Sequence, residues 1–378
     1  MDVWAIDLIL AFLISAFLSG VMIPQILLIS FRKKLFDVPD ERKIHKTLVP
    51  RLGGLAFKPV IFFTIAFVIG LNILIGNNDI ISQISANNTE LTFVYCAIMM
   101  LYVIGVADDL VGVRYRAKFV AQIICGLMFI AGGVSLYTLD GVLGLHQLPV
   151  CFSWFATVFL VVFISNAINL IDGIDGLCSG LCSVVLGFYG FVFAYIGEYI
   201  YSLLSFATLG VLVPFFYYNV FGDPEHNKKI FMGDTGSLTI GIIISFLSIK
   251  ISQLPETSLY SESNLFVLSF APLIVPCFDV IRVFLRRIRE HKSPFLPDKN
   301  HIHHKFLAIG LHQRKAMITI ILVSMLFTVV NVFLSFMINV NILLLANILV
   351  WTVGHLWLTK KIKKIRAAVP TDALNSKL

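Results

Sequence analysis

Four short polar segments interrupt an otherwise apolar chain, and each carries side chains that can bind phosphate or a metal ion. They are the acidic pair 108–109, the run 166–177, the segment 233–237 and the histidine-rich segment 297–304. Ionisable groups at membrane depth are energetically costly and usually functional. These segments are therefore the first candidates for a functional site.

Asp108 and Asp109 place two carboxylates at the end of a long apolar stretch, near the predicted membrane interface. Close carboxylates repel each other, so one of them has a raised pKa unless a cation lies nearby. A metal ion or a lysine such as Lys118 can supply that cation. The alternative is an exposed helix end without function, although acids at a helix C-terminus oppose the helix dipole.

Asn169, Asp172 and Asp175 recur at three-residue intervals, so a helical path puts them on one face. Gly173 and Gly176 interrupt that path and let the backbone approach a ligand closely. Oxygen donors of this kind suit Mg²⁺, or Mn²⁺ as a substitute, which share their coordination with waters and substrate phosphates. An Asx-rich turn between two membrane helices is the structural alternative.

The segment 233–237 reads Gly-Asp-Thr-Gly-Ser and opens another apolar stretch. Asp234, Thr235 or Ser237 can cap the free amides at the start of a helix. A helix N-terminus with glycines also binds phosphate, and Asp234 can hold a metal ion beside it. The segment therefore predicts either a simple cap or a cap combined with a phosphate and metal site.

His301, His303 and His304 lie in a loop rich in proline, lysine and arginine. Their spacing suits a zinc site poorly and better suits neutral or protonated donors to phosphate oxygens; surface histidines without function are the alternative. Together, the four segments are typical of phosphoryl-type transfer. In that chemistry a divalent cation neutralises a diphosphate while the protein supplies position and charge.

The elements that must position these segments are membrane-spanning helices. Of the 378 residues, 58% are hydrophobic and only 13% are charged, about half the charged share of a soluble domain. The prediction is an all-α, polytopic helical bundle. Stretches long enough to cross a bilayer are found at 4–29, 54–76, 91–107, 117–138, 148–165, 177–196, 200–220, 234–250, 264–285, 316–337 and 339–358, which gives eleven spans.

The basic residues set the predicted orientation. Lys and Arg accumulate in the odd-numbered loops and the C-terminal tail, and the even-numbered loops have almost none apart from Lys250 at one edge. Because basic loops stay in the cytoplasm, the N-terminus is predicted outside and the C-terminus in the cytoplasm. This placement also explains the net charge of +7 without a nucleic-acid partner. All four polar segments then fall on the cytoplasmic face, which is the main argument that they form one site.

The predicted organisation is one integral membrane domain, 1–366, followed by a disordered cytoplasmic tail, 367–378. Asp279 and Arg282, one turn apart in the ninth span, are interpreted as a structural pair that positions the loop after them. An ion-coupled secondary transporter is the alternative from a different class. It predicts acids near the bilayer midplane and two related halves, whereas the acids here lie at one interface and no repeat is visible.

At these residues the chain resembles the polyprenyl-phosphate N-acetylhexosamine-1-phosphate transferase superfamily, in particular its bacterial undecaprenyl-phosphate GlcNAc-1-phosphate transferase branch. The resemblance extends from segments 37–40 and 50–54 through the four polar segments to His304. It implies an enzyme of the bacterial inner membrane with its site on the cytoplasmic face. The implied reaction is attack of undecaprenyl phosphate on the β-phosphate of a UDP-N-acetylhexosamine, most commonly UDP-GlcNAc. UMP is released, and the lipid-linked product initiates a cell-envelope glycan.

The resemblance also implies roles for residues of this sequence. Asp108 matches the residue proposed to act on the lipid phosphate, with Asp109 in support, while Asp234 and Asn169 match residues associated with Mg²⁺. Substrate contacts are implied for a further set: Asp172 with the nucleoside, Asp175 with uracil, Lys46 and Lys118 with the phosphates, and His301, His303 and His304 with the diphosphate and sugar.

The nearest alternative is the related transferase that uses UDP-MurNAc-pentapeptide. That branch has three consecutive histidines and typically Val after the Gly-Asp pair, whereas here Ile302 interrupts the histidines and Thr235 follows Asp234. A lipid phosphate is largely dianionic at neutral pH. A single displacement with Asp108 as orienter or base is therefore expected rather than an aspartyl-phosphate intermediate. The choice of N-acetylhexosamine stays open, and so does a homodimer as the assembled state.

Overall fold

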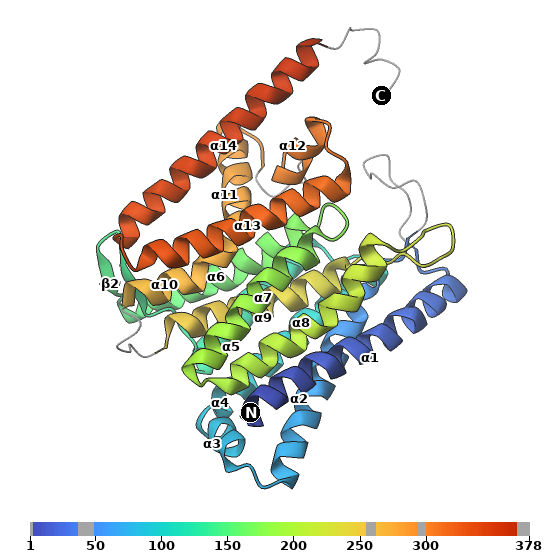
Figure 1. Ribbon diagram of the computed structural model, residues 1–378, viewed down its shortest axis with the longest axis vertical. Coiled ribbons are helices and arrows are strands. Elements are labelled where there is room, and N and C mark those ends of the chain that lie inside the picture. Colours follow the sequence, from blue (N-terminus) through green and yellow to red (C-terminus); the bar gives the residue numbers. More distant parts are fainter. Residues whose placement is uncertain (1–2, 37–48, 255–261, 294–299, 369–378) are drawn as a thin grey trace.

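The computed structural model describes residues 3–36, 49–254, 262–293 and 300–368. Within them the chain forms a bundle of helices with one short β-hairpin at its edge (Figure 1). Ten of the helices are long and apolar enough to cross a membrane. The structure therefore agrees with the predicted all-α, polytopic membrane bundle.

The helices follow one another with mostly short connections. In chain order the helices are α1 (Val3–Lys33), the 3₁₀-helix η1 (Gly53–Ala56), α2 (Phe57–Leu74), α3 (Asn78–Ala86), α4 (Asn88–Val111), α5 (Tyr115–Ala131), α6 (Val150–Ile171), α7 (Leu177–Ile196), α8 (Tyr199–Val220), α9 (Gly233–Ser252), α10 (Glu262–Phe270), the 3₁₀-helix η2 (Ala271–Leu273), α11 (Ile274–Arg289), α12 (Ile302–Ala308), α13 (Gln313–Ser335) and α14 (Val340–Ala368). The antiparallel hairpin β1 (Thr138–Val142) and β2 (Leu145–Gln147) connects α5 to α6. Neither the hairpin nor the short helix α3 was predicted from the sequence.

The bundle has two distinct ends. The motif end is defined as the end where the predicted polar segments meet. There Asn169, in the last turn of α6, contacts Ser237 near the start of α9. At the opposite end, Trp4 of α1 stacks on Tyr199 at the start of α8, with ring centroids 4.3 Å apart. The first helix thus begins at the opposite end, whereas the C-terminal end of α14 lies beside α12 at the motif end (Figure 1). The start of α1 and the end of α14 thus lie at opposite ends of the bundle. The predicted orientation, with one end assigned to the cytoplasm, stays a prediction.

Of the eleven predicted spans, 117–138 is the one that falls outside the ten long apolar helices. It corresponds to α5, which has 17 residues and starts at the motif end, where Lys118 reaches Asp234. At the opposite end, Gln253 after α9 donates to the carbonyl oxygens of Gly133 and Ser135, just beyond α5. Thus α5 runs between the same two ends as its neighbours. The total of eleven crossings stays a prediction.

α9 is the central helix and is buried on nearly all sides, mainly by α4 and α6 and further by α10, η1 and α7. Small residues allow these close contacts. Gly241 of α9 lies against Ser165 of α6, where an added Cβ would be 2.9 Å from the Ser165 Cα. Gly105 of α4 lies in the same way against the backbone of Thr235. Residues without bulk at such contacts let membrane helices approach closely.

The ninth predicted span is bent rather than straight. α10 ends at Phe270, η2 follows, and α11 leaves in a different direction (Figure 1). Pro272 stands within η2 and Pro276 in the first turn of α11. Proline lacks an amide hydrogen and clashes with the preceding turn, so it interrupts a continuous helix. The bend carries the end of α11 toward the segment before α12, where Arg282 donates to the carbonyl oxygen of Asn300.

A buried ion pair holds the opposite end of the bundle together. Lys250, near the end of α9, donates to one carboxylate oxygen of Glu90 in the first turn of α4 at 2.7 Å. The hydroxyl of Tyr201 in α8 donates to the other oxygen at 2.7 Å. The lysine that departed from the predicted charge pattern is thus the partner of a buried acid.

We expect Lys250→Met to destabilise the bundle, because the Glu90 carboxylate would stay buried without its cation. Removing one partner of a buried ion pair typically costs about 3–5 kcal/mol, and the partial exposure of both side chains reduces this loss. The midpoint of heat-induced unfolding in detergent should fall for Lys250→Met. It should recover largely in the double variant Lys250→Met/Glu90→Gln. An unchanged midpoint in the single variant would show that the pair does not hold the helices together.

Candidate active site

The acidic pair of α4 lies beside the first turn of α9. Oxygen atoms of Asp108, Asp109 and Asp234 lie within 4.8 Å of one another. Lys118 of α5 lies between two of these groups, with its Nζ 3.2 Å from an oxygen of Asp108 and 2.6 Å from an oxygen of Asp234. The cation that the sequence requires near these close carboxylates is, in this structure, Lys118.

Asp109 and Asp108 make different contacts although they are adjacent. One oxygen of Asp109 accepts a hydrogen bond from the amide of Asp234 at 2.8 Å. The other accepts from the amide of Thr235 at 2.9 Å and from its hydroxyl at 2.6 Å. A carboxylate there satisfies free amides of α9 and complements its dipole. The prediction that a side chain of 233–237 caps the helix is therefore wrong, because Asp109 of α4 accepts the hydrogen bonds from the start of α9. Through these bonds Asp109 also holds Asp234 in position, and its predicted catalytic role stays a prediction.

Glycines let the first turn of α9 fit tightly against η1. Gly233 has a φ of +73°, and an added Cβ there would collide with the carbonyl oxygen of Arg51. Gly54 of η1 packs against the backbone of Gly236, and its amide donates to the carbonyl oxygen of Met232 at 2.9 Å. A side chain at these positions would push the two segments apart. The segment 50–54 and the start of α9 therefore form one backbone unit that carries Asp234.

Asn169 brings the end of α6 to the same place. Its side-chain amide donates to the hydroxyl of Ser237 at 2.8 Å, and the side chain lies beside the carboxylate of Asp234. The two residues predicted to bind metal are thus direct neighbours.

The loop after α6 holds Asp175 in place. The carboxylate of Asp175 forms an ion pair with Lys229, with the two atoms 2.5 Å apart. The amide of Gly176, which has a φ of +75°, donates to the side-chain oxygen of Asn219 in α8 at 2.6 Å. From the sequence, Lys229 was used only as one of the basic residues that set the membrane orientation. No role was predicted for Asn219. Both fix the loop that presents the predicted nucleoside contacts.

Asp172 remains open to solvent within this loop. The surrounding protein removes water from its carboxyl group and raises its pKa above the ordinary value. The nearby carboxylate of Asp234 adds to the rise, and Arg51 opposes it. Because the side chain is exposed, solvent screens part of this effect. Asp172 is therefore an acid that faces other acids and is accessible to a ligand.

The histidine segment packs onto the same loop. His303 lies against Gly173, where an added Cβ would collide with the imidazole ring. Burial, followed by the neighbouring His304 and His301, lowers the pKa of His303 to about 3, so the ring is neutral at physiological pH. The rings of His301 and His303 are parallel, with centroids 5.8 Å apart. The second and fourth predicted segments therefore meet in the structure.

Asp279 of α11 anchors the histidine segment. Its fully buried carboxylate lies 2.8 Å from Nδ1 of His301 and accepts hydrogen bonds from the amide of Ile302 at 3.0 Å and from Arg282 at 2.8 Å. The interpretation of Asp279 and Arg282 as a structural pair that positions the next loop is confirmed. The direct contact with His301 was not predicted, and its only signal in the sequence is an acid inside an apolar span.

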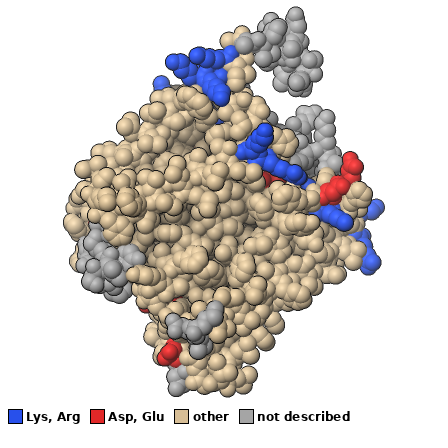
Figure 2. Space-filling view, viewed as in Figure 1, with Lys and Arg blue, Asp and Glu red and all other residues tan. Residues whose placement is uncertain are grey.

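The predicted site residues within the described ranges therefore gather at the motif end. Lys46 lies outside the described residues, as does the tail from 369 onward. Figure 2 shows Lys and Arg side chains along one rim of the molecule, over the ends of α14 and α1, while most of the visible face beside it carries no charge. This basic rim is the feature that the charge pattern of the loops predicted.

The chain is similar to known proteins over most of its length. The family model described as glycosyl transferase family 4 matches residues 91–252. A probable undecaprenyl-phosphate N-acetylglucosaminyl 1-phosphate transferase of Bacillus subtilis (strain 168) is 30% identical over 336 residues, 87% of this chain and 85% of the relative. The undecaprenyl-phosphate alpha-N-acetylglucosaminyl 1-phosphate transferases of Escherichia coli O157:H7 and Salmonella typhi are 28% and 29% identical over 300 residues, 79% of this chain and 76% of each relative.

We expect the hydrogen bonds from Asp109 to the start of α9 to stabilise the folded protein. Asp109→Ala removes the acceptor for three donors, and loss of a helix cap typically costs about 0.5–2 kcal/mol. Asp109→Asn keeps one acceptor oxygen, so its unfolding midpoint in detergent should lie between those of Asp109→Ala and the unaltered protein. Glu225→Ala, which removes an exposed acid, is the control and should change nothing. A midpoint for Asp109→Ala equal to that of the control would contradict the capping role.

Proposed function

Because the chain belongs to glycosyl transferase family 4, we propose that it transfers N-acetylglucosamine 1-phosphate from UDP-N-acetylglucosamine to undecaprenyl phosphate. The relatives described above are named for transfer to this acceptor. The observation that carries the proposal is the meeting of Asp108, Lys118 and Asp234 with the Asp172 loop and the histidine segment at one end of an apolar bundle. This arrangement offers both charge for a diphosphate and access for a lipid.

We place the reaction on the cytoplasmic face of a bacterial inner membrane. The ten apolar helices and the membrane-enzyme relatives support a multi-pass membrane protein. The basic rim at the motif end supports the cytoplasmic assignment, because Lys and Arg accumulate on that side of membrane proteins. A nucleotide-sugar donor is a soluble compound of the cytoplasm, which fits the same face.

The donor set of the acidic cluster suits Mg²⁺, with Mn²⁺ as a substitute, because these ions prefer carboxylate oxygens. Asp108 and Asp234 would hold the ion, since they already share one cation, Lys118, and Asn169 lies beside them. The oxygens of Asp109 are engaged by the start of α9 instead. When bound, the ion would neutralise the diphosphate of the donor.

The proposed reaction is a single displacement. A phosphate oxygen of undecaprenyl phosphate attacks the β-phosphorus of UDP-N-acetylglucosamine, the bond from that phosphorus to the bridging oxygen breaks, and UMP leaves with that oxygen. The attacking phosphate is largely dianionic at neutral pH, so Asp108 has only to orient it. Lys118 stays next to both acids and supplies positive charge near the transferred phosphoryl group. His303 is neutral and offers a hydrogen bond without adding charge.

The direct test is transfer of label. Purified protein is incubated with undecaprenyl phosphate, Mg²⁺ and UDP-N-acetylglucosamine labelled in the sugar. The label should appear in a lipid product. Chelation of the metal should prevent formation of this product. A panel of other UDP-N-acetylated sugars, UDP-MurNAc-pentapeptide included, measures donor choice. No lipid-linked label from any donor would contradict the proposal. A phospho-enzyme trapped without the acceptor lipid would contradict the single displacement.

We expect Asp108→Asn and Asp234→Ala to abolish most turnover, because each removes a charge from the centre of the site. Both variants should stay folded, as judged by their unfolding midpoints in detergent. Asp79→Asn is the matched control, since it removes an exposed acid at the start of α3 and should retain full turnover. Turnover near the unaltered rate in either site variant would contradict the proposed roles.

Gly173→Ala should impair turnover without removing any charged group. The added methyl collides with the imidazole of His303 and pushes the histidine segment away from the Asp172 loop. Misplacement of a positioned group by about 1 Å can cost about a hundredfold in rate. Gly187→Ala in α7 is the matched control, because its Cβ would meet only Leu209 at an ordinary 3.9 Å. Equal rates for the two variants would show that the contact between the histidines and the loop is not needed.

A further inference from the structure

A second group of polar side chains lies where α11, α12 and α14 meet, and the proposed reaction does not use it. Several buried atoms there have no hydrogen-bond partner among the described residues: both ring nitrogens of His355, the indole nitrogen of Trp351 and Nε of Arg282. His355 is only 6% exposed. Buried polar groups are almost always paired, so a cluster of unpaired ones calls for an explanation.

The same place carries more positive than negative charge. Lys305 of α12 lies next to His355, and its Nζ donates to the hydroxyl of Thr359 at 2.9 Å. Lys305 forms no ion pair with any residue that the structure describes. Burial, and then the nearby Arg282, lower the pKa of Lys305 to about 8. Asp279, the acid that acts on the charge of Lys305, is already shared between Arg282 and His301. Two cations close together in a poorly solvated place favour an anion between them.

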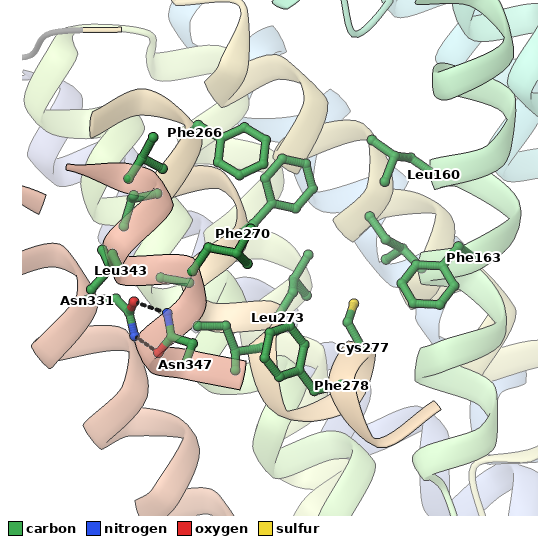
Figure 3. Close-up of a pocket in the computed structure, with 16 residues that line it drawn as sticks. Leu160, Phe163, Phe266, Phe270, Leu273, Cys277, Phe278, Asn331, Leu343 and Asn347 are labelled. Carbon is green, nitrogen blue, oxygen red and sulfur yellow. Dashed lines mark hydrogen bonds between the residues drawn. The ribbon is translucent and has the colours of Figure 1, made fainter. Parts of the chain in front are cut away.

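An apolar cavity of about 180 Å³ lies beside this cationic group. Figure 3 shows Phe270, Leu273 and Phe278 in the middle of its lining, with Leu160 and Phe163 of α6 on one side. On the other side Asn331 of α13 and Asn347 of α14 bond to each other, with Nδ2 of Asn331 3.0 Å from the Asn347 oxygen and the reverse bond 2.5 Å. Because these amides satisfy each other, the cavity offers its occupant mainly apolar contacts.

The cavity and the cationic group follow one another along the same helix faces. On α14, Asn347, Trp351 and His355 are spaced by four residues and so lie on one face. On α11, Phe278 of the cavity and Arg282 of the cationic group are also four residues apart. The ring of Phe278 lies 6.0 Å from that of Trp351, which joins the two regions. The surface is therefore apolar toward the membrane interior and cationic toward the motif end.

We propose that this surface binds an anionic phospholipid of the surrounding bilayer, with its phosphate at Arg282, Lys305 and His355 and one acyl chain in the apolar cavity. Phosphate oxygens would accept hydrogen bonds from the donors that lack partners and would balance the excess positive charge. The outer face of α14 carries exposed apolar side chains such as Leu345, Leu349 and Val353, so the helix that borders the cavity also faces the bilayer in which the lipid is dissolved. The acceptor lipid is the less suitable occupant, because its phosphate must reach Asp108 and Asp234 for transfer.

The proposal is tested by binding, which does not depend on turnover. The full chain is purified in detergent and titrated with phosphatidylglycerol, and bound lipid is counted by native mass spectrometry. We expect one lipid per chain, and at least about tenfold weaker binding in Lys305→Met/His355→Leu, because charge-assisted hydrogen bonds are lost. Lys305→Arg keeps the charge and should bind as well as the unaltered protein. Lys364→Met removes an exposed charge from the same helix and should also bind normally.

Competitors identify the source of the phosphate. Phosphatidylcholine and inorganic phosphate should displace phosphatidylglycerol poorly, since the first lacks net negative charge and the second lacks an acyl chain. Displacement by equimolar undecaprenyl phosphate would overturn the proposal and assign the site to the acceptor. Unchanged binding in the double variant would overturn it as well. The unfolding midpoint of each variant in lipid-free detergent verifies that weaker binding does not reflect unfolding.

Discussion

The hydrogen bonds from the start of α9 to the carboxylate of Asp109 are the interaction on which the site depends. α9 carries Asp234 in its first turn, so any shift of this helix moves Asp234 away from Lys118 and Asn169. α4 fixes α9 at both ends, through Asp109 at the motif end and through Glu90 at the opposite end. The site is thus held by two acids of one helix against the central helix of the bundle.

The adjacent acids Asp108 and Asp109 show how one helix end serves two purposes. Neighbouring residues of a helix point in different directions, so Asp109 faces the amides of α9 while Asp108 faces Lys118. In the histidine segment, too, different residues provide support and contact the site. Asp279 supports His301 from behind, and His303 packs on the loop that presents Asp172. Asp234 and His301 are therefore each held in place by an acid of another helix, Asp109 of α4 and Asp279 of α11.

Much of the fold and the composition of the site follow from the sequence, because membrane helices and charge asymmetry are local signals. The bend at Pro272, the early end of α5 before Gly132 and the hairpin after it were not predicted, since each depends on how neighbouring helices pack. In the site, the metal and phosphate residues could be selected by type and spacing. The capping role of Asp109 and the contact between Asp279 and His301 could not, because both join residues more than twenty positions apart in sequence.

The burial of α9 has a consequence for how the protein is made. Of the ten long apolar helices, α9 has the lowest mean hydropathy, yet it is the most deeply buried. Its serines and threonines would enter lipid poorly if the helix left the translocation machinery alone. α10, which also packs on α9, follows it in the chain, but the two main packing partners of α9, α4 and α6, both precede it. They can already stand in the bilayer when α9 emerges from the ribosome, so the order of synthesis provides the site's central helix with a protein environment instead of lipid.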